Sequence, residues 1–425
     1  MSSPLHRPLS ALPRRSMLKQ RIPPSTRHQA RRFQQRHSLA QAAYTSSASP
    51  SSSSSSASKP RIILGIESSC DDSCASVVTS DKRILSSIVT RQDHSHTHGI
   101  HPLVAALNHH SNIPTTIASA LAHANLTHTD IDAVAVTQGP GMNSSLGVGL
   151  TAAKTLAALL DKPIIYVHHM QAHALTPLLT EQIPPRFPFL TLLVSGGHTL
   201  LVLARGVSEF QILATTTDDS IGDAFDKVAR DLAIPWAHAP GAALESFCAQ
   251  SSDAAQPDAL SFPVPQKGKT SFSYSGLKSA VTRHVQHQGG PSAMTDEQRR
   301  QVAQAFQAAA CAQLEDKLAM ALRPTTATTG AASRRVPPRI DMGVDPLSIK
   351  SVVCSGGVAA NAFLRTRLRT ALDGIDRRDV QLSFPPLALC TDNAAMIAFA
   401  GHLLWHQRTN DYTRNSRAKW SVEDI

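Results

Sequence analysis

Two histidines spaced four residues apart could hold a metal ion. The sextet HHMQAH occupies residues 168–173, so His169 and His173 are related as i and i+4. On a helix this spacing places both imidazoles on one face, about one turn apart, where one divalent ion can bind both. Because the chain contains 20 histidines, an isolated HxxxH could also arise without any site. A second signal is therefore needed.

Two glycine-rich segments supply that signal. LLVSGGHTLL (192–201) and VVCSGGVAANAFLR (352–365) each place SGG at the end of an apolar run, where a strand should stop. Backbone N–H groups in such turns can bind an anion such as phosphate. Metal ligands combined with two anion-binding loops predict a site for a phosphorylated small molecule.

A pair of carboxylates lies at the tip of a predicted hairpin. RIILGIESS (61–69) is a short apolar run, and CDDSCASVVT follows it. The pattern predicts strand, tight turn and strand, with Asp71 and Asp72 in the turn. These carboxylates could accept a proton during catalysis, or they could form a solvated Asx turn.

The charge of the chain is concentrated at its beginning. Residues 1–60 contain ten Lys and Arg and no acidic residue, whereas the remainder has 41 − 10 = 31 basic residues against 31 acidic ones. With the Ser-rich linker at 46–58, this composition predicts a disordered transit peptide over residues 1–59 and import into the mitochondrial matrix. Two alternatives for residues 1–60 are a chloroplast transit peptide and a disordered basic tail without a targeting role. Any surface for nucleic acid on the neutral remainder must be a local patch.

The pattern of apolar runs predicts two α/β halves. Each half opens with a hairpin, CDDS at 70–73 and SGGH at 195–198, and continues with alternating helices and strands. Two lobes around a cleft are the simplest architecture. We expect helices at 114–123, at 144–160 with Ser144 or Ser145 as the cap, and at 295–322 with a Thr295/Gln298 capping box. No GxGxxG segment is present, and the one GK[ST] segment, Gly268 to Thr270, has Pro263 where a P-loop needs its first glycine, so neither the Rossmann nor the P-loop class is indicated. No apolar run is long enough for a transmembrane helix, so we expect no membrane insertion.

Eight segments in order resemble the signatures of one family, the tRNA N6-adenosine threonylcarbamoyltransferases, once described as O-sialoglycoprotein endopeptidases. The segments are GIESSCDDS, TQGPGMNSSLGVG, VHHMQAH, LLVSGGHTLL, DDSIGDAFDKVA, SFSYSGLKSA, SGGVAANAFLR and CTDNAAMIAFAG, and the resemblance extends from about Ile62 to Trp405. With the transit-like segment, the chain is similar to the mitochondrial branch.

The resemblance implies a fold, a reaction and partners. The fold is the actin-like ATPase superfold of sugar kinases and heat-shock chaperones, with two ribonuclease-H-like lobes around a cleft. The expected lobes are residues 60–168, completed by the C-terminal helix near 390–425, and 169–389, with an insertion loop at 323–348. The expected reaction moves a threonylcarbamoyl group from threonylcarbamoyl-AMP, made by a separate synthase, to N6 of adenine 37 in tRNAs reading codons that start with A. The expected assembly is a homodimer with one divalent ion, Fe or Zn, per subunit.

The resemblance also implies site residues. The metal ligands are His169, His173 and Asp392. The substrate-binding residues are those of the LVSGG loop, the FDK aspartate and the asparagine after the second SGG: Leu193, Val194, Ser195, Gly196, Gly197, Asp226 and Asn361. We predict Asp71 and Asp72 as catalytic groups. Alternatives stay open for several residues. Asp226 could pair with Arg230, Asn361 could cap the helix at 360–372, His198 could only satisfy its turn, and His168 could be a packing residue.

Three features depart from the family pattern. PLVAALNH (102–109) lacks the Glu and Arg of the family's PELASRxH, Ala242 replaces a substrate-binding glycine, and the segment 323–348 has no match. As a local tRNA patch, Arg365, Arg367 and Arg369 are candidates, or else they form a solvated helix face.

Two other classes of function stay open. A metalloprotease would need HExxH, but Met170 occupies the position of the general base. A sugar kinase or chaperone-like ATPase of the same superfold would not need HHMQAH.

Overall fold

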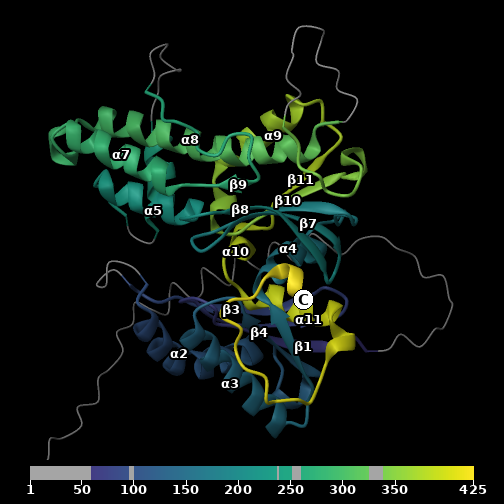
Figure 1. Ribbon diagram of the computed structural model, residues 1–425. Coiled ribbons are helices and arrows are strands. Elements are labelled where there is room, and N and C mark those ends of the chain that lie inside the picture. Colours follow the sequence, from purple (N-terminus) through teal and green to yellow (C-terminus); the bar gives the residue numbers. More distant parts are fainter. Residues whose placement is uncertain (1–58, 95–99, 237–238, 251–259, 325–337) are drawn as a thin grey trace, which may run out of the picture. The chain divides into compact units, whose positions relative to one another are not determined.

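The computed structural model describes residues 59–94, 100–236, 239–250, 260–324 and 338–425 (Figure 1). The predicted transit peptide and Ser-rich linker, apart from Lys59, lie outside these residues. Within the described residues, no helix has the length and apolarity needed to cross a membrane.

The first sheet contains the predicted N-terminal hairpin. Its strand order is β3-β2-β1-β4-β5. β1 and β2 pair antiparallel, with Asp71 and Asp72 in the connection, and β2 pairs antiparallel with β3. β4 and β5 continue parallel to β1, so the carboxyl ends of these three strands share one edge. The strands are β1 (Ile62–Glu67), β2 (Ser73–Thr79), β3 (Ile84–Thr90), β4 (Ala133–Gly139) and β5 (Ile164–His168).

The second sheet repeats this topology. Its order is β11-β10-β6-β7-β8-β9, in which β6, β7 and β8 form an antiparallel meander and β10 and β11 run parallel to β6. The order β8-β7-β6-β10-β11 therefore matches β3-β2-β1-β4-β5, which confirms the predicted mixed α/β fold with two ribonuclease-H-like lobes. The strands are β6 (Phe189–Val194), β7 (Thr199–Gly206), β8 (Glu209–Thr216), β9 (Ser271–Phe272), β10 (Ser351–Ser355) and β11 (Gln381–Ser383).

Helices pack on both sheets. Beside the first sheet lie α2 (Pro102–His123), α3 (Asn143–Leu159) and α11 (Ala394–Leu403). Beside the second are α5 (Ile221–Asp231), α6 (Pro240–Cys248), α7 (Ser275–His287), α8 (Asp296–Leu322) and α9 (Ala362–Asp373), with α10 (Leu387–Cys390) short and α4 (His169–Thr180) following β5. α11 approaches β1 closely at Gly65, where an added Cβ would lie 2.3 Å from the Ala394 carbonyl oxygen. This contact brings residues from opposite ends of the chain together. The boundaries of the two lobes stay a prediction.

Several local predictions need correction. The helix expected at 114–123 begins at Pro102, because proline suits the first helical position, and Pro114 lies inside the helix. Neither Ser144 nor Ser145 caps α3, whose N-cap is Met142 without a side-chain hydrogen bond. The Thr295/Gln298 capping box of α8 is confirmed.

The predicted insertion loop at 323–348 is only partly a surface loop. Residues 325–337 lie outside the described residues. In the part that follows, the Ile340 N–H donates to the Met320 carbonyl, and both Ile340 and Met342 are buried in the core of the second lobe. Apolar side chains thus return the segment to the core before β10.

Candidate active site

The histidine helix is fixed by its first residues. β5 ends at His168 and α4 begins at His169. His168 Nδ1 accepts hydrogen bonds from the backbone N–H groups of Met170 and Gln171, at 3.2 and 3.3 Å, so this side chain caps the helix. Burial lowers the pKa of His168 to about 3, which keeps the imidazole neutral and able to accept. His168 therefore positions the helix. It is not one of the predicted metal ligands, in line with the prediction that it could be a packing residue.

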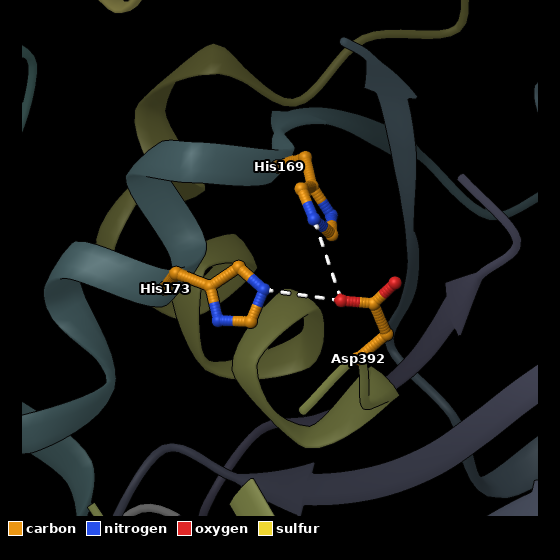
Figure 2. Close-up of side chains that lie close together, drawn as sticks. All are labelled: His169, His173 and Asp392. Carbon is orange, nitrogen blue, oxygen red and sulfur yellow. Dashed lines mark hydrogen bonds and ion pairs between the residues drawn. The ribbon is translucent and has the colours of Figure 1, made fainter. Parts of the chain in front are cut away.

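His169, His173 and Asp392 lie together, as Figure 2 shows. Asp392 Oδ1 is 3.3 Å from His173 Nε2 and 3.5 Å from His169 Nε2. Two atoms bound tetrahedrally to one ion at about 2.1 Å lie about 3.4 Å apart, so these separations fit a shared divalent ion. His173 Nδ1 is buried and has no hydrogen-bond partner among the described residues. The donor set and its spacing fit iron or zinc.

Asp392 is held by its neighbour in sequence. Asn393 caps α11, because its Oδ1 accepts from the Met396 N–H at 2.9 Å, and its amide donates to the carbonyls of Leu389 and Thr391. The asparagine is fully buried. These bonds fix the turn that places Asp392 beside His173, which lies 219 positions earlier in the chain.

Glu67 is a site residue that the sequence prediction missed. It ends β1 with no exposed surface, and its carboxylate accepts hydrogen bonds from His169 Nδ1 at 2.9 Å, from Thr137 Oγ1 and from the Ser69 N–H. Burial lowers the pKa of His169, but Glu67 and Asp392 together raise it to about 9. Glu67 thus fixes Nδ1–H and directs Nε2 toward Asp392. An acidic residue inside an apolar strand was the signal that could have identified it.

The two SGG loops lie side by side. β6 and β10 pair in parallel, with Leu193 opposite Ser355, so both loops leave the same edge of the sheet. Gly356 has φ +101° and passes so close to Val194 that a Cβ would lie 2.3 Å from its carbonyl oxygen. In contrast, a Cβ on Gly196 or Gly197 would meet nothing within 4 Å. The first loop therefore has open space above it, as a ligand would need.

The first loop is built on its serine. Ser195 Oγ accepts from the N–H groups of Gly197 and His198, and the Ser195 carbonyl accepts from the Gly222 N–H at the start of α5. Burial, together with the neighbouring His169 and His173, lowers the pKa of His198 to about 4. His198 therefore belongs to the electrostatic environment of the metal ligands, although its turn also uses its backbone.

Asp71 and Asp72 are held near Asp392 by the β1–β2 turn. Burial, Asp71 and Asp392 raise the pKa of Asp72 to about 7. The turn is supported by His109 of α2, whose Nδ1 is 2.7 Å from Ser73 Oγ and whose Nε2 is 2.9 Å from the Cys70 carbonyl oxygen. This histidine is retained within PLVAALNH, so the altered segment still anchors the carboxylate turn.

Asp226 and Asn361 occupy structural positions on the second lobe. Asp226 Oδ1 accepts from the Gly241 N–H at 2.8 Å, at the start of α6 and beside Ala242. The predicted ion pair with Arg230 is absent from the part of the chain that the structure describes. Asn361 Oδ1 accepts a hydrogen bond from the Leu364 N–H and caps α9. This agrees with the alternative prediction that Asn361 is a helix cap. These contacts leave the predicted substrate-binding roles of both residues untested.

The three candidate arginines for tRNA are largely engaged within the protein. Arg365 donates to the Ala359 carbonyl and lies over the Phe384 ring, and Arg367 forms a bidentate ion pair with Glu315. Arg369 binds two carbonyls and Asp373. These residues fasten α9 to its surroundings, so the structure gives little support to a tRNA patch here.

Comparison with solved structures agrees with this fold. A HypF crystal structure from T. kodakarensis superposes with a TM-score of 0.50 at 12% identity, covering 83% of this chain and 48% of that one. The likeness supports the two-lobed actin-like ATPase superfold.

The sequence comparisons identify the family. The model of the tRNA N6-adenosine threonylcarbamoyltransferase family matches residues 83–399. A protein of that name from Symbiobacterium thermophilum is 42% identical over 347 residues, or 81% of this chain and 92% of that protein. Another from Neisseria gonorrhoeae is 36% identical over 380 residues, or 86% and 99%. The chain therefore belongs to the tRNA N6-adenosine threonylcarbamoyltransferase family, and it is a transferase that acts on tRNA.

Proposed function

We propose that the protein transfers the threonylcarbamoyl group of threonylcarbamoyl-AMP to N6 of adenine 37 in mitochondrial tRNAs that read codons starting with A. The observation that carries this proposal is the grouping of His169, His173 and Asp392, with Asp72 close enough to Asp392 for their charges to interact. A mixed anhydride is already activated, so its transfer needs no covalent nucleophile. It needs an anion site, charge stabilisation and a proton acceptor.

The residues of the chain have distinct roles in this reaction. The N6 amine attacks the carbamoyl carbon, a C–N bond forms, the bond from that carbon to the phosphate oxygen breaks, and AMP leaves. Asp72 accepts the amine proton, since a carboxylate with a pKa of about 7 is a suitable base near neutral pH. Leu193 to Gly197 and the second SGG loop hold the substrate phosphate and threonyl group. A divalent iron or zinc ion on His169, His173 and Asp392, one per subunit, would supply charge stabilisation for the phosphate.

The proposal includes a subcellular location and two protein partners. Ten basic residues and no acidic ones in residues 1–60 support import into the mitochondrial matrix. A separate synthase supplies threonylcarbamoyl-AMP, and a second copy of the chain completes a homodimer.

The structure favours neither alternative function. Met170 is buried in an apolar cluster and cannot serve as the base of a metalloprotease.

The experiment is an assay of purified protein with threonylcarbamoyl-AMP, a divalent metal ion and mitochondrial tRNA, read out by mass spectrometry of the tRNA nucleosides. Formation of N6-threonylcarbamoyladenosine at position 37 is expected. A folded, metal-loaded protein that forms none would overturn the proposal.

A further inference from the structure

A transferase that acts on tRNA needs positive charge near the reacting adenine. The chain after residue 60 has 31 basic and 31 acidic residues, so a general positive field is not available. The arginines of α9 are engaged by Glu315, Asp373, backbone carbonyls and an aromatic ring. Basic side chains without such partners are better placed to bind the phosphates.

The segment 408–420, between α11 and the C-terminus, has an excess of positive charge. It contains Arg408, Arg414, Arg417 and Lys419 against the single acid Asp411, a net charge of +3. All four basic side chains are exposed. Asp411 is paired with Arg414. Arg417 and Lys419 have no carboxylate partner within 4.0 Å in the part of the chain that the structure describes.

Backbone contacts hold this segment against the first sheet, from the start of β5 to the end of β4. Thr409 pairs with Ile164 at the start of β5, and the Arg417 N–H donates to the Gln138 carbonyl at 2.8 Å. The Ala418 carbonyl then accepts from the Gly141 N–H at 3.2 Å. In Figure 1 the segment is the yellow coil that passes β4 and α3 before reaching the C-terminus. It is therefore a fixed part of the surface.

The end of the segment reaches the metal helix. The Trp420 carbonyl accepts from His168 Nε2 at 3.1 Å, and the two rings lie 4.6 Å apart. His168 directly precedes the predicted ligand His169. The guanidinium of Arg417 lies 3.9 Å from the centre of the Trp420 ring. Exposed positive charge and a partly exposed aromatic ring thus lie beside His168, the residue that directly precedes the predicted metal ligand His169.

From this placement we infer that the segment 408–420 is the docking surface for the phosphates of the tRNA anticodon stem-loop, with Arg417 and Lys419 as the main contacts. Lys and Arg bind the phosphate backbone with little dependence on sequence, and aromatic rings provide stacking surfaces for unpaired bases. A loop bound here would place an unpaired adenine close to His169 and Asp392. The inference rests on the proposed function, because it takes tRNA as the substrate.

The test is tRNA binding to the purified full-length protein as a function of salt concentration. The variant Arg417→Gln/Lys419→Gln is compared with Lys269→Gln/Arg283→Gln, which removes the same charge from exposed positions of the second lobe. We expect the first variant to bind an anticodon stem-loop RNA roughly tenfold more weakly, and its slope of log affinity against log salt to fall by about 0.7 to 0.9 per lost contact. The control should match the wild type, and Arg417→Lys/Lys419→Arg should retain the wild-type slope.

Several outcomes separate this inference from the proposed function. Wild-type slope and affinity in the Gln variant, in a protein that still modifies tRNA, would refute the docking surface and leave the function intact. A weaker affinity with an unchanged salt slope would also refute it, since it would indicate a purely structural role. If the double variant does not fold, Lys419→Gln alone gives the same reading, because the Lys419 side chain makes no hydrogen bond or ion pair with the described residues. A wild-type protein that neither binds nor modifies tRNA would count against the function itself.

Discussion

At the scale of single residues, the site depends on a carboxylate that binds no substrate. Glu67 is fully buried, and its hydrogen bond to His169 Nδ1 sets the orientation of that imidazole. Partners of this kind change metal affinity by about 10 to 100-fold when they are removed.

We therefore predict that Glu67→Gln weakens metal binding about 10 to 100-fold while the protein stays folded. The amide has the same shape but lacks the charge that raises the pKa of His169, so this pKa should fall in the metal-free variant. Metal titration by calorimetry and NMR titration of the histidine measure the two effects. Asp132→Asn is the control, because among the described residues its carboxylate accepts a hydrogen bond only from the Ile62 N–H, at the other end of β1. Wild-type metal affinity in Glu67→Gln would rule out the positioning role.

Asp72 gives a prediction about pH. Its pKa is raised to about 7, so below that pH the carboxyl group is protonated and cannot accept the amine proton. The rate should fall as pH drops through about 7, and Asp72→Asn should lower kcat by about 100-fold or more with the metal retained. A profile of kcat/KM against pH checks this. A flat profile from about pH 6 to about pH 8, or an active Asp72→Asn, would remove Asp72 from the mechanism.

At the scale of elements, the residues at the start of α11 contribute both to the stability of the fold and to the geometry of the metal site. Asn393 caps this helix and has no exposed surface, and Asp392 directly precedes it. A break here affects both the packing of α11 on β1 and the position of the carboxylate.

Asn393→Ala should cost about 2 kcal/mol of unfolding free energy, since it removes a helix cap and leaves buried groups without partners. It should also weaken metal binding. Thr295→Ala, which removes the cap of α8 on an exposed helix start, should cost about 1 kcal/mol without changing the metal affinity. Denaturant unfolding and metal titration of both variants make the comparison. Equal metal affinities would show that the cap and the site are independent.

The elements also show which parts of the fold and the site could be predicted from the sequence. The hairpin with Asp71 and Asp72, the α8 capping box and the strand–loop–helix around the second SGG follow from local patterns, and the structure contains them. Spacing alone could not place Asp392 beside His173, because the contact depends on α11 packing against β1. The segment 408–420 has no periodicity, and its position is set by backbone hydrogen bonds to β4 and β5 that side-chain patterns do not reveal.

At the scale of the whole molecule, the charge of the chain has two separate parts. The formal net charge of +10 equals the ten basic residues within 1–60, because the rest of the chain has 31 basic and 31 acidic residues. The composition of residues 1–60 predicts a targeting segment, while the fold and the candidate site are formed by the rest of the chain.

We predict that residues 1–60 direct a fluorescent protein to mitochondria and are removed on import. Replacing five of the arginines in this segment with glutamine should leave the fusion in the cytosol, because import of such segments depends on positive charge. Microscopy and N-terminal sequencing of the mature protein test both statements. A cytosolic wild-type fusion, or a mature protein still beginning at Met1, would contradict them.

The central claim is that threonylcarbamoyl transfer to tRNA takes place at His169, His173 and Asp392. The most direct measurement is mass spectrometry of N6-threonylcarbamoyladenosine in tRNA after incubation with His173→Ala, whose folding and metal content are recorded in parallel with those of the wild type. We predict a folded variant with little bound metal and little modified adenosine, since a site that loses one of three protein ligands holds its ion weakly. Full metal content with wild-type formation of the modified nucleoside would contradict the account.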